Sequence, residues 1–438
     1  MQVTIPPITE SGAGARTDWS RRDVLSVVAA GLATAELPRV ARSAAMPAVD
    51  APRHPMRIRT ITAGVAVSGP DDVEALDRAL ARLLRVRKRM QDAGFEVQTI
   101  RVATTPLVAD LDEGKRLAIG ALEKFDAAVA AENAILSIGP ILAVDRFDPA
   151  LGAWAAELAR RTKQISFSVT VASAEHGIYR SAIRSAAQVI ADLSRVDATG
   201  SANFRFAAAA SVPAGTPFFP VAYHQGPDSL AFGLESAGLL QRAFEGAADF
   251  DDAAVRLRGV MEAQLGPIDA MGSQFAAAER VQYLGIDTSP APGMDRSIGA
   301  AIETLTRQPF GRPSTLQACA TITAVLKSLS IRSCGYSGLM LPVLEDPILA
   351  QRGRERCYGM QELLLYSTVC GTGLDVVPIP GDTGADVIGR IIADVATLAY
   401  RLRKPLSARL FPVPGKASGD VVRFDDARLT ETRVFEAG

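Results

Sequence analysis

The sequence predicts an α/β protein in which about ten strands alternate with helices. Apolar residues make up 48% of the 438 residues, so the chain can build a large core. Short runs of strand length recur along the chain, and most are followed by apolar residues at helical spacing. This alternation is typical of a sheet or barrel with helices outside. We therefore expect one such domain over residues 57–424, followed by a short tail at 425–438.

The first half of this domain is expected to supply five strands and four helices. The run at 58–67 (IRTITAGVAV) has the composition of a strand, and Gly69 and Pro70 then turn the chain into a helix. In that helix Val73, Leu76 and Leu80 keep helical spacing, and Gly94 ends it. The same reasoning predicts strands at 95–102, 134–138, 165–171 and 204–210, and helices at 110–131, 150–161 and 181–196.

The second half continues the alternation with five more strands. They are expected at 230–234, 281–286, 338–343, 374–379 and 407–411, with helices at 236–246, 251–280, 314–328, 359–370 and 385–401. The helix at 314–328 begins at Pro313 and Ser314, which are residue types typical of a helix start. No exact internal repeat and no long linker interrupts the pattern, so one domain is favoured over two.

Charge and hydropathy exclude two classes of partner. The formal net charge is −1, whereas a nucleic-acid-binding protein needs a concentrated basic face, so we expect no nucleic-acid partner. No apolar run reaches the roughly 18 residues that a membrane-spanning helix needs. The remaining expectation is a small-molecule ligand. The predicted helices are strongly apolar, which is compatible with a homodimer.

The first 48 residues differ in composition from the rest. Arg21 and Arg22 precede a weakly apolar run at 24–35, and small residues follow at 43–48. This order is the twin-arginine export pattern of bacterial proteins. We therefore predict that residues 1–48 are a cleaved signal and leader, that the translocation machinery is a partner, and that the protein is exported. The alternatives are an Ala-rich leader without structure or a wrongly assigned start codon.

Acids, a histidine and cations follow several predicted strands, which is where sites of α/β folds collect. His224, Glu345 and Asp382 are the candidate catalytic residues, because they can transfer protons near neutral pH when their surroundings tune them. The candidate ligand-binding residues are Tyr223, Thr383, Arg409 and Lys416. For His224 the alternative is a hydrogen bond to a loop carbonyl, and for Asp382 or Thr383 it is capping of the helix at 385–401.

Three further acids could bind a divalent metal ion, which is the one candidate cofactor. Glu235, Asp287 and Asp346 offer the oxygen ligands that hard cations prefer. The alternative for Asp346 and its neighbour Glu345 is to cap a short turn at Pro347.

Several long motifs resemble one known family. They are IRTITAGV, PFFPVAYHQG with FGLES, GYSGLMLPVLEDPIL, ELLLYSTVCGTGLDVVPIPGDT and KPLSARLFPVPGK, spread over about residues 57–424. Together they resemble the prokaryotic family catalogued as domain of unknown function 711. The resemblance implies a ten-stranded α/β barrel of the pyruvate-formate-lyase-like type, built from two five-stranded halves with helices outside. It implies no particular reaction.

The resemblance raises the question of glycyl radical chemistry. The segment at 332–337 (RSCGYS) is similar to the fingerprint around the radical glycine of such enzymes. That fingerprint normally lies close to the C-terminus, however, and no cysteine precedes the segment by the hundreds of residues that radical enzymes need. An exported protein would also lose such a radical to oxygen. We therefore do not expect this chemistry.

The leading hypothesis is an exported enzyme that acts on a small polar, carboxylate-bearing molecule by acid/base chemistry of the hydrolase or lyase type. His224 or Asp382 is then the base, Glu345 an acid, and Arg409 and Lys416 bind the anion, with a divalent metal as a candidate aid. The second hypothesis is a ligand-binding or assembly protein without catalysis on the same barrel.

Overall fold

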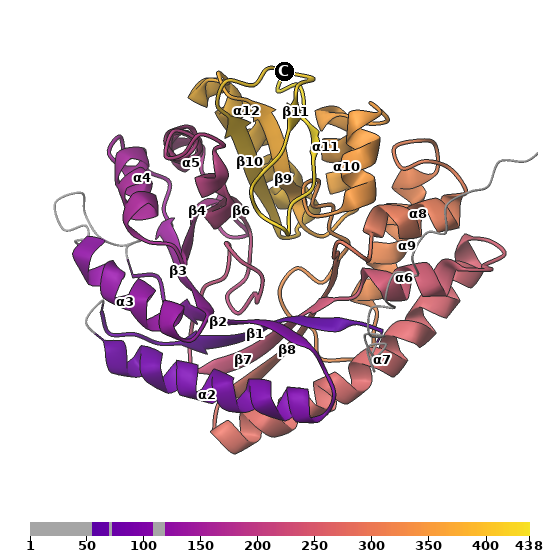
Figure 1. The fold of residues 1–438 in the computed structure, drawn as a ribbon, viewed down its shortest axis with the longest axis horizontal. Coiled ribbons are helices and arrows are strands. Elements are labelled where there is room, and N and C mark those ends of the chain that lie inside the picture. Colours follow the sequence, from indigo (N-terminus) through magenta and orange to yellow (C-terminus); the bar gives the residue numbers. More distant parts are fainter. Residues whose placement is uncertain (1–54, 70–71, 108–118) are drawn as a thin grey trace, which may run out of the picture. The chain divides into compact units, whose positions relative to one another are not determined.

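Ten strands form one large, mostly parallel sheet that is covered by helices (Figure 1). The structure is a computed structural model and describes residues 55–69, 72–107 and 119–438. These residues belong to one compact unit, Pro52–Gly438. The predicted signal at 1–48 lies outside the described residues. The fold is therefore an α/β architecture, as the alternating sequence pattern predicts.

The strands follow the predicted runs closely, with small shifts at their ends. They are β1 (Arg57–Val65), β2 (Val97–Thr104), β3 (Ala134–Leu142), β4 (Ile165–Ser173), β5 (Gly177–Ile178), β6 (Phe206–Ala210), β7 (Ser229–Glu235), β8 (Gln282–Ala291), β9 (Gly373–Pro380), β10 (Leu406–Val413), β11 (Val421–Val422) and β12 (Thr432–Arg433). The last two form a separate hairpin, and Val434 and Phe435 beyond it are fully buried. The predicted tail at 425–438 is thus part of the fold.

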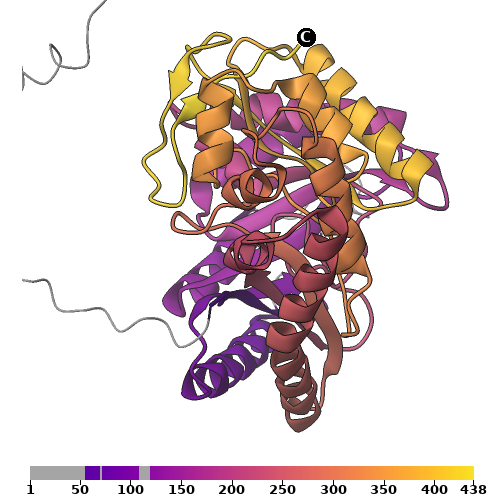
Figure 2. The same cartoon turned by 90° about the vertical axis from the view of Figure 1, so that its right-hand side faces the viewer.

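The helices cover the outer face of the sheet. They are α2 (Val73–Asp92), α3 (Ile119–Ala131), α4 (Leu151–Arg161), α5 (Arg180–Leu193), α6 (Ala237–Phe244), α7 (Phe250–Glu279), α8 (Ile298–Thr306), α9 (Thr315–Lys327), α10 (Pro347–Arg354), α11 (Met360–Ser367) and α12 (Ala385–Leu402). In the views of Figures 1 and 2, α2 packs outside β1 and β2, and α7 packs outside β7 and β8. None of the described helices is both long and apolar enough to cross a bilayer.

The strands run in two opposed sets. The strands β1, β2, β3, β4 and β6 pair in parallel, as do β7 with β8 and β9 with β10. Antiparallel pairs join the sets, between β1 and β7 and between β6 and β10. The starts of the first set therefore lie beside the ends of the second set. This arrangement decides which loops surround the site.

The sheet does not close into a barrel through regular ladders among the described residues, because its path ends at β8 and β9. A connecting segment, residues 332–343, runs between these edges. Its Cys334 donates a backbone hydrogen bond to Ile286 of β8 at 3.1 Å, and Val343 donates one to Asp375 of β9 at 3.1 Å. The predicted strand at 338–343 is thus wrong as a regular strand. One reason is that Gly335 and Ser337, just before it, take φ angles of 64° and 43°, outside the extended region.

The inner face of the sheet is polar, in contrast to its helix-covered face. Thr60 and Thr62 of β1 lie 3.1 Å apart through their hydroxyls, and Thr62 donates to the Pro217 carbonyl at 3.0 Å. Ser137 of β3 donates to Ala222 at 2.6 Å. Because strand side chains alternate between faces, these hydroxyls share the side on which the loop at 211–228 lies. The interior can therefore hold a polar cavity.

Candidate functional site

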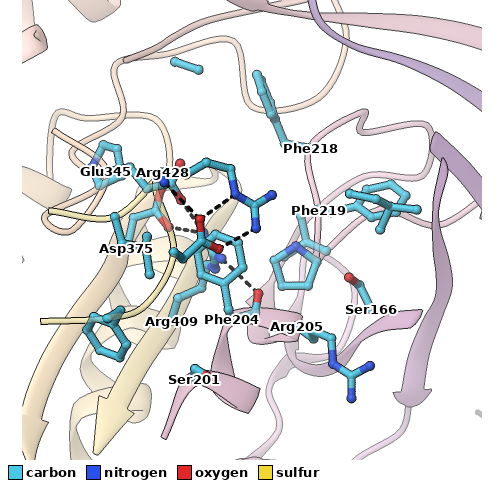
Figure 3. A pocket seen from close by; sticks show the side chains of 18 of the residues that line it. Ser166, Ser201, Phe204, Arg205, Phe218, Phe219, Glu345, Asp375, Arg409 and Arg428 are labelled. Atoms are coloured by element: carbon cyan, nitrogen blue, oxygen red, sulfur yellow. Dashed lines mark hydrogen bonds and ion pairs between the residues drawn. The ribbon is translucent and has the colours of Figure 1, made fainter. Parts of the chain in front are cut away.

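A cavity of about 570 Å³ opens on the inner face of the sheet (Figure 3). Its wall includes Arg59 and Ser166, near the starts of β1 and β4, and Arg101, in the middle of β2. Asp375 of β9 and Arg409 of β10 come from the opposed set. The volume lies within the range of about 300–1,000 Å³ that is usual for small-molecule sites.

Two carboxylates share one arginine in this wall. Arg409 Nη1 lies 2.7 Å from Asp375 Oδ1 and 3.7 Å from Glu345 Oε1. Arg59 Nη2 binds the other oxygen of Glu345 at 2.9 Å. Only 9–11% of the Glu345, Asp375 and Arg409 side chains is exposed. The cluster is therefore shielded from water and open mainly toward the cavity, where Figure 3 shows it on the side opposite Phe218 and Phe219.

Burial raises the pKa of Asp375 above its usual value. The neighbouring charge of Glu345 adds to this rise, while Arg409 opposes it. A carboxyl that keeps its proton toward neutral pH can donate that proton, and a second carboxylate beside it can accept one. The pair Asp375 and Glu345 thus has the surroundings of an acid/base pair.

Arg101 is a buried cation without an acidic partner among the described residues. Its side chain lies over the Phe219 ring at 5.1 Å, and its Nε donates to Thr99 Oγ1 at 3.1 Å. Burial and the neighbouring Arg59 lower the pKa of Arg101 to about 9, and the charge of Glu345, which is not within ion-pair distance, opposes this shift. A buried charge is costly unless it is paired. An anion in the cavity would supply the missing partner.

A second arginine in the wall also has no ion pair within the described ranges. Arg205 precedes β6 and donates to the carbonyl and hydroxyl oxygens of Thr162, at 2.7 and 3.2 Å. Burial lowers the pKa of Arg205 to about 10. The positive potential of Arg101 is therefore reinforced along the same wall.

Two buried polar atoms at the cavity have no hydrogen-bond partner in the described part of the chain. They are Arg409 Nε and Thr372 Oγ1. Buried polar groups are normally satisfied, so each such atom needs an explanation. A polar ligand group, or ordered water, in the cavity would provide one.

The wall also contains aromatic side chains. Phe204, Phe218, Phe219 and Tyr336 line the cavity, and Arg409 lies over the Phe204 ring at 4.9 Å. The Tyr336 hydroxyl donates to Ser407 Oγ at 3.0 Å, so its ring is held in place. The cavity thus combines a charged cluster with apolar surface.

Of the residues predicted from sequence, the structure brings Glu345 and Arg409 together in this cavity. His224 and Tyr223 lie elsewhere. His224 is 1% exposed, its Nε2 lies 2.8 Å from the Gly226 carbonyl, and burial lowers its pKa. Tyr223 donates to the Val212 carbonyl at 3.3 Å. The alternative of a loop-carbonyl hydrogen bond therefore describes His224, and neither side chain lines the cavity.

Asp382, Thr383 and Lys416 also lie outside the cavity. They occupy two neighbouring turns after β9 and β10, joined by a hydrogen bond from Gly381 N to the Lys416 carbonyl at 3.0 Å. The Asp382 and Lys416 side chains are exposed. The alternative of a helix cap at Asp382 or Thr383 is wrong, because Gly384 is the N-cap of α12 and no side chain caps it.

The three predicted metal ligands lie in three separate places. Glu235 pairs with Arg57 at 2.6 Å, and Asp287 accepts the backbone N–H groups of Tyr336 and Ser337 at 2.8 and 2.9 Å. Asp346 caps α10, as its alternative predicted, and also accepts from Ile298 at 2.6 Å at the start of α8. Burial raises the pKa of both aspartates. Within the described ranges, no group of three His, Cys, Asp or Glu side chains is placed to hold a metal ion.

Sequence reasoning missed Arg101, Arg205 and Phe219 as site residues. The signal that could have found Arg101 is a charge inside a predicted strand (QTIRVA), where an apolar or small residue is expected. Nothing in the sequence indicates which loop covers that strand.

Comparisons with known proteins identify the family. A model of the family described as Uncharacterised ACR (DUF711) matches residues 52–426. The chain is 31% identical over 374 residues to a UPF0210 protein of Pyrobaculum arsenaticum, covering 80% of this chain and 82% of the relative. A UPF0210 protein of Desulforudis audaxviator is 29% identical over 399 residues, covering 84% and 88%. The relatives include archaea, so the match does not assign the chain to bacteria. The chain belongs to the DUF711 family, whose curated relatives are named UPF0210 proteins.

Proposed function

We propose that this protein is an enzyme that binds a small carboxylate-bearing molecule in the cavity and exchanges protons with it. The observation that carries the proposal is that one cavity holds a buried arginine without an acidic partner, Arg101, beside the carboxylate pair Asp375 and Glu345. The arginine matches an anion, and the pair matches acid/base chemistry.

In this proposal Arg101 binds the carboxylate of the substrate. Asp375 donates a proton, because its raised pKa keeps it neutral to higher pH than an ordinary aspartate. Glu345, which Arg59 holds at 2.9 Å, accepts a proton from water or from the substrate. These roles suit hydrolysis or a lyase-type elimination. Asp375 and Glu345 thus take the place that the sequence-based hypothesis gave to His224 and Asp382.

An untargeted metabolite survey tests the proposal. Purified protein is incubated with a cell extract, in parallel with Asp375→Asn and with Asp382→Ala as a matched control, because Asp382 is exposed and outside the cavity. We expect an anionic metabolite to disappear with the wild type and the control and to persist with Asp375→Asn. Equal disappearance with all three proteins would contradict the assignment. Retention of a metabolite without turnover would favour the alternative of a binding protein.

We also propose that the sheet is a pyruvate-formate-lyase-like barrel in which residues 332–343 take the place of the missing strand. Its support is the pair of isolated parallel bridges, Ile286 with Ser333 and Pro342 with Asp375, which link the segment to both edges of the sheet. The two opposed sets of strands also suit a barrel made of two halves.

Export by the twin-arginine route remains a proposal that rests on Arg21 and Arg22. Residues 1–48 fused to a folded reporter should direct it across the bacterial inner membrane. The double substitution Arg21→Lys and Arg22→Lys should keep it inside. Export of the doubly substituted fusion, or retention of the unchanged one, would contradict the proposal.

A further inference from the structure

The cavity has more aromatic surface than a small polar acid could cover. Besides the charged cluster, the wall takes the rings of Phe204, Phe218, Phe219 and Tyr336 from three separate parts of the chain. Phe218 is 9% exposed and Tyr336 5%, so both rings are largely packed and offer one face or edge to the cavity. A ligand that fills about 570 Å³ must cover this apolar surface as well as the charges.

Arginine side chains lie over two of these rings. Arg101 lies over Phe219 at 5.1 Å, and Arg409 and Arg428 lie over Phe204 at 4.9 and 5.6 Å. A guanidinium that stacks on a ring through its face keeps its N–H edge free for a planar anion. For Arg101 this edge is unused, because among the described residues its one hydrogen bond comes from Nε.

The two stacks come from different elements of the cavity wall. Phe204 precedes β6, and both arginines over its ring already have acidic partners. Arg409 pairs with Asp375, and Arg428 pairs with Asp426. Phe219 lies on the loop at 211–228 and carries the arginine that lacks an acid. A carboxylate is therefore expected at the Phe219 side, and the body of the ligand is expected to extend along the rings toward Asp375.

We propose that the ligand is an aryl-substituted carboxylate, a planar aromatic ring that carries one carboxylate group directly or through a short alkyl linker, bound with the carboxylate on Arg101 and the ring against Phe204, Phe218 and Phe219. This inference rests on the proposed function, since it names the class of carboxylate that the same cavity takes. It replaces the small polar acid expected from the sequence with an amphiphilic one. The apolar part of the ligand then supplies most of the affinity, and Arg101 supplies the selection for an anion.

Isothermal titration calorimetry of the full chain with three probes tests the inference. Phenylacetate has the ring and the charge, acetate has the charge alone, and phenylacetamide has the ring alone. Burying a ring is expected to make phenylacetate bind at least about tenfold more tightly than acetate. Loss of the charge should weaken phenylacetamide by a similar factor. Equal affinities of phenylacetate and acetate, or of phenylacetate and phenylacetamide, would overturn the inference even without any variant.

Two variants separate the two parts of the ligand. Phe219→Leu should weaken phenylacetate several-fold and leave acetate unchanged, whereas Arg101→Gln should weaken both acids. The surface stack of Arg184 over Phe147, at 4.2 Å, offers matched controls, because neither residue lines the cavity. Arg184→Gln and Phe147→Leu should leave all three probes unaffected, and circular dichroism checks that each variant is folded.

The outcomes distinguish this inference from the proposed function. If acetate and phenylacetate bind equally and Arg101→Gln weakens both, the aryl class is wrong and the carboxylate site stands. If neither acid binds, the aryl class is wrong, and the metabolite survey decides the proposed function independently. If Arg101→Gln leaves phenylacetate binding unchanged, the anion is not bound where the cavity places it, and both are contradicted.

Discussion

At the level of single residues, Arg101 lowers the free energy of unfolding of the ligand-free protein and in return provides a charge that can bind an anion. Arg101 is 8% exposed and has no ion-pair partner among the described residues. Folding therefore carries a desolvation penalty for this charge. Such groups are typical of binding sites, where a ligand later supplies the opposite charge.

We therefore expect Arg101→Met to stabilise the ligand-free protein by about 1 kcal/mol, since an apolar side chain of similar length replaces an unpaired buried charge. Urea denaturation with an unchanged slope measures the difference. The matched surface change Arg184→Met should leave stability within about 0.5 kcal/mol. A clear loss of stability in Arg101→Met would mean that the arginine serves the fold.

Asp375 leads to a prediction about pH. Its folded-state pKa is raised above the ordinary value, mainly by burial, so the folded state favours the protonated form. The stability that this form contributes is fully present below the ordinary pKa of 3.8 and is lost as pH rises through the raised pKa.

The wild type should therefore lose stability relative to Asp375→Asn as pH rises from about 4 to 7, because the asparagine stays neutral throughout. Urea denaturation of both proteins across this interval measures the difference. Phe147→Leu, which changes no titrating group, should show no such trend against the wild type. A difference between wild type and Asp375→Asn that is flat or grows with pH would contradict the raised pKa.

At the scale of elements, Asp346 joins two helix starts. It accepts backbone N–H groups from Leu349 of α10 at 3.0 Å and from Ile298 of α8 at 2.6 Å, and the Ser297 hydroxyl at 2.6 Å. Both helix N-termini favour a negative charge. The sequence suggested either a metal ligand or a cap here, and the structure shows a cap that serves two helices.

Asp346→Ala should consequently destabilise the protein by about 3 kcal/mol, since several buried donors lose their acceptor together. The exposed Asp382→Ala is the comparison and should change stability by no more than about 0.5 kcal/mol. Thermal or urea unfolding measures both. Near-equal stability of Asp346→Ala and wild type would show that water or a neighbour replaces the cap.

The elements themselves were largely predictable from the sequence, and the exceptions have local causes. Strands such as β1 and β9 are short runs of apolar and β-branched residues between turn signals. The segment at 338–343 is also rich in apolar residues, but it forms no regular ladder. Gly335 and Ser337 just before it form a left-handed turn, and Asp287 holds that turn by accepting the backbone N–H group of Ser337. The short helices α8 and α10 were not predicted from the sequence.

At the scale of the whole molecule, strand direction explains which site residues the sequence could reveal. The sequence-based expectation places the site where strands end, which holds for a sheet whose strands all run one way. Here the cavity lies at the starts of β1, β3 and β4 and beside the opposed set. Glu345 was predicted because it follows a segment that pairs in parallel with the opposed set, whereas Arg101 and Ser166 lie inside strands and His224 belongs to the loop at 211–228.

Closure of the sheet would be visible in the amide exchange of residues 332–343. If residues 332–343 complete a barrel, the amides of Cys334 and Val343 should exchange with solvent about as slowly as those of the strands on either side, because their hydrogen bonds break only when the sheet opens. Hydrogen exchange measured by mass spectrometry with peptides covering 332–343 checks this. Exchange as fast as that of the exposed turn at 381–384 would contradict closure.

A crystal structure with 4-bromophenylacetate tests directly whether this cavity binds a carboxylate through Arg101. The anomalous signal of bromine locates the ring independently of the fit of the rest of the ligand. We predict a bromine peak inside the cavity and a carboxylate within hydrogen-bond distance of the Arg101 guanidinium. A peak outside the cavity, or a carboxylate that leaves Arg101 unpaired at a concentration that saturates binding in solution, would contradict the account.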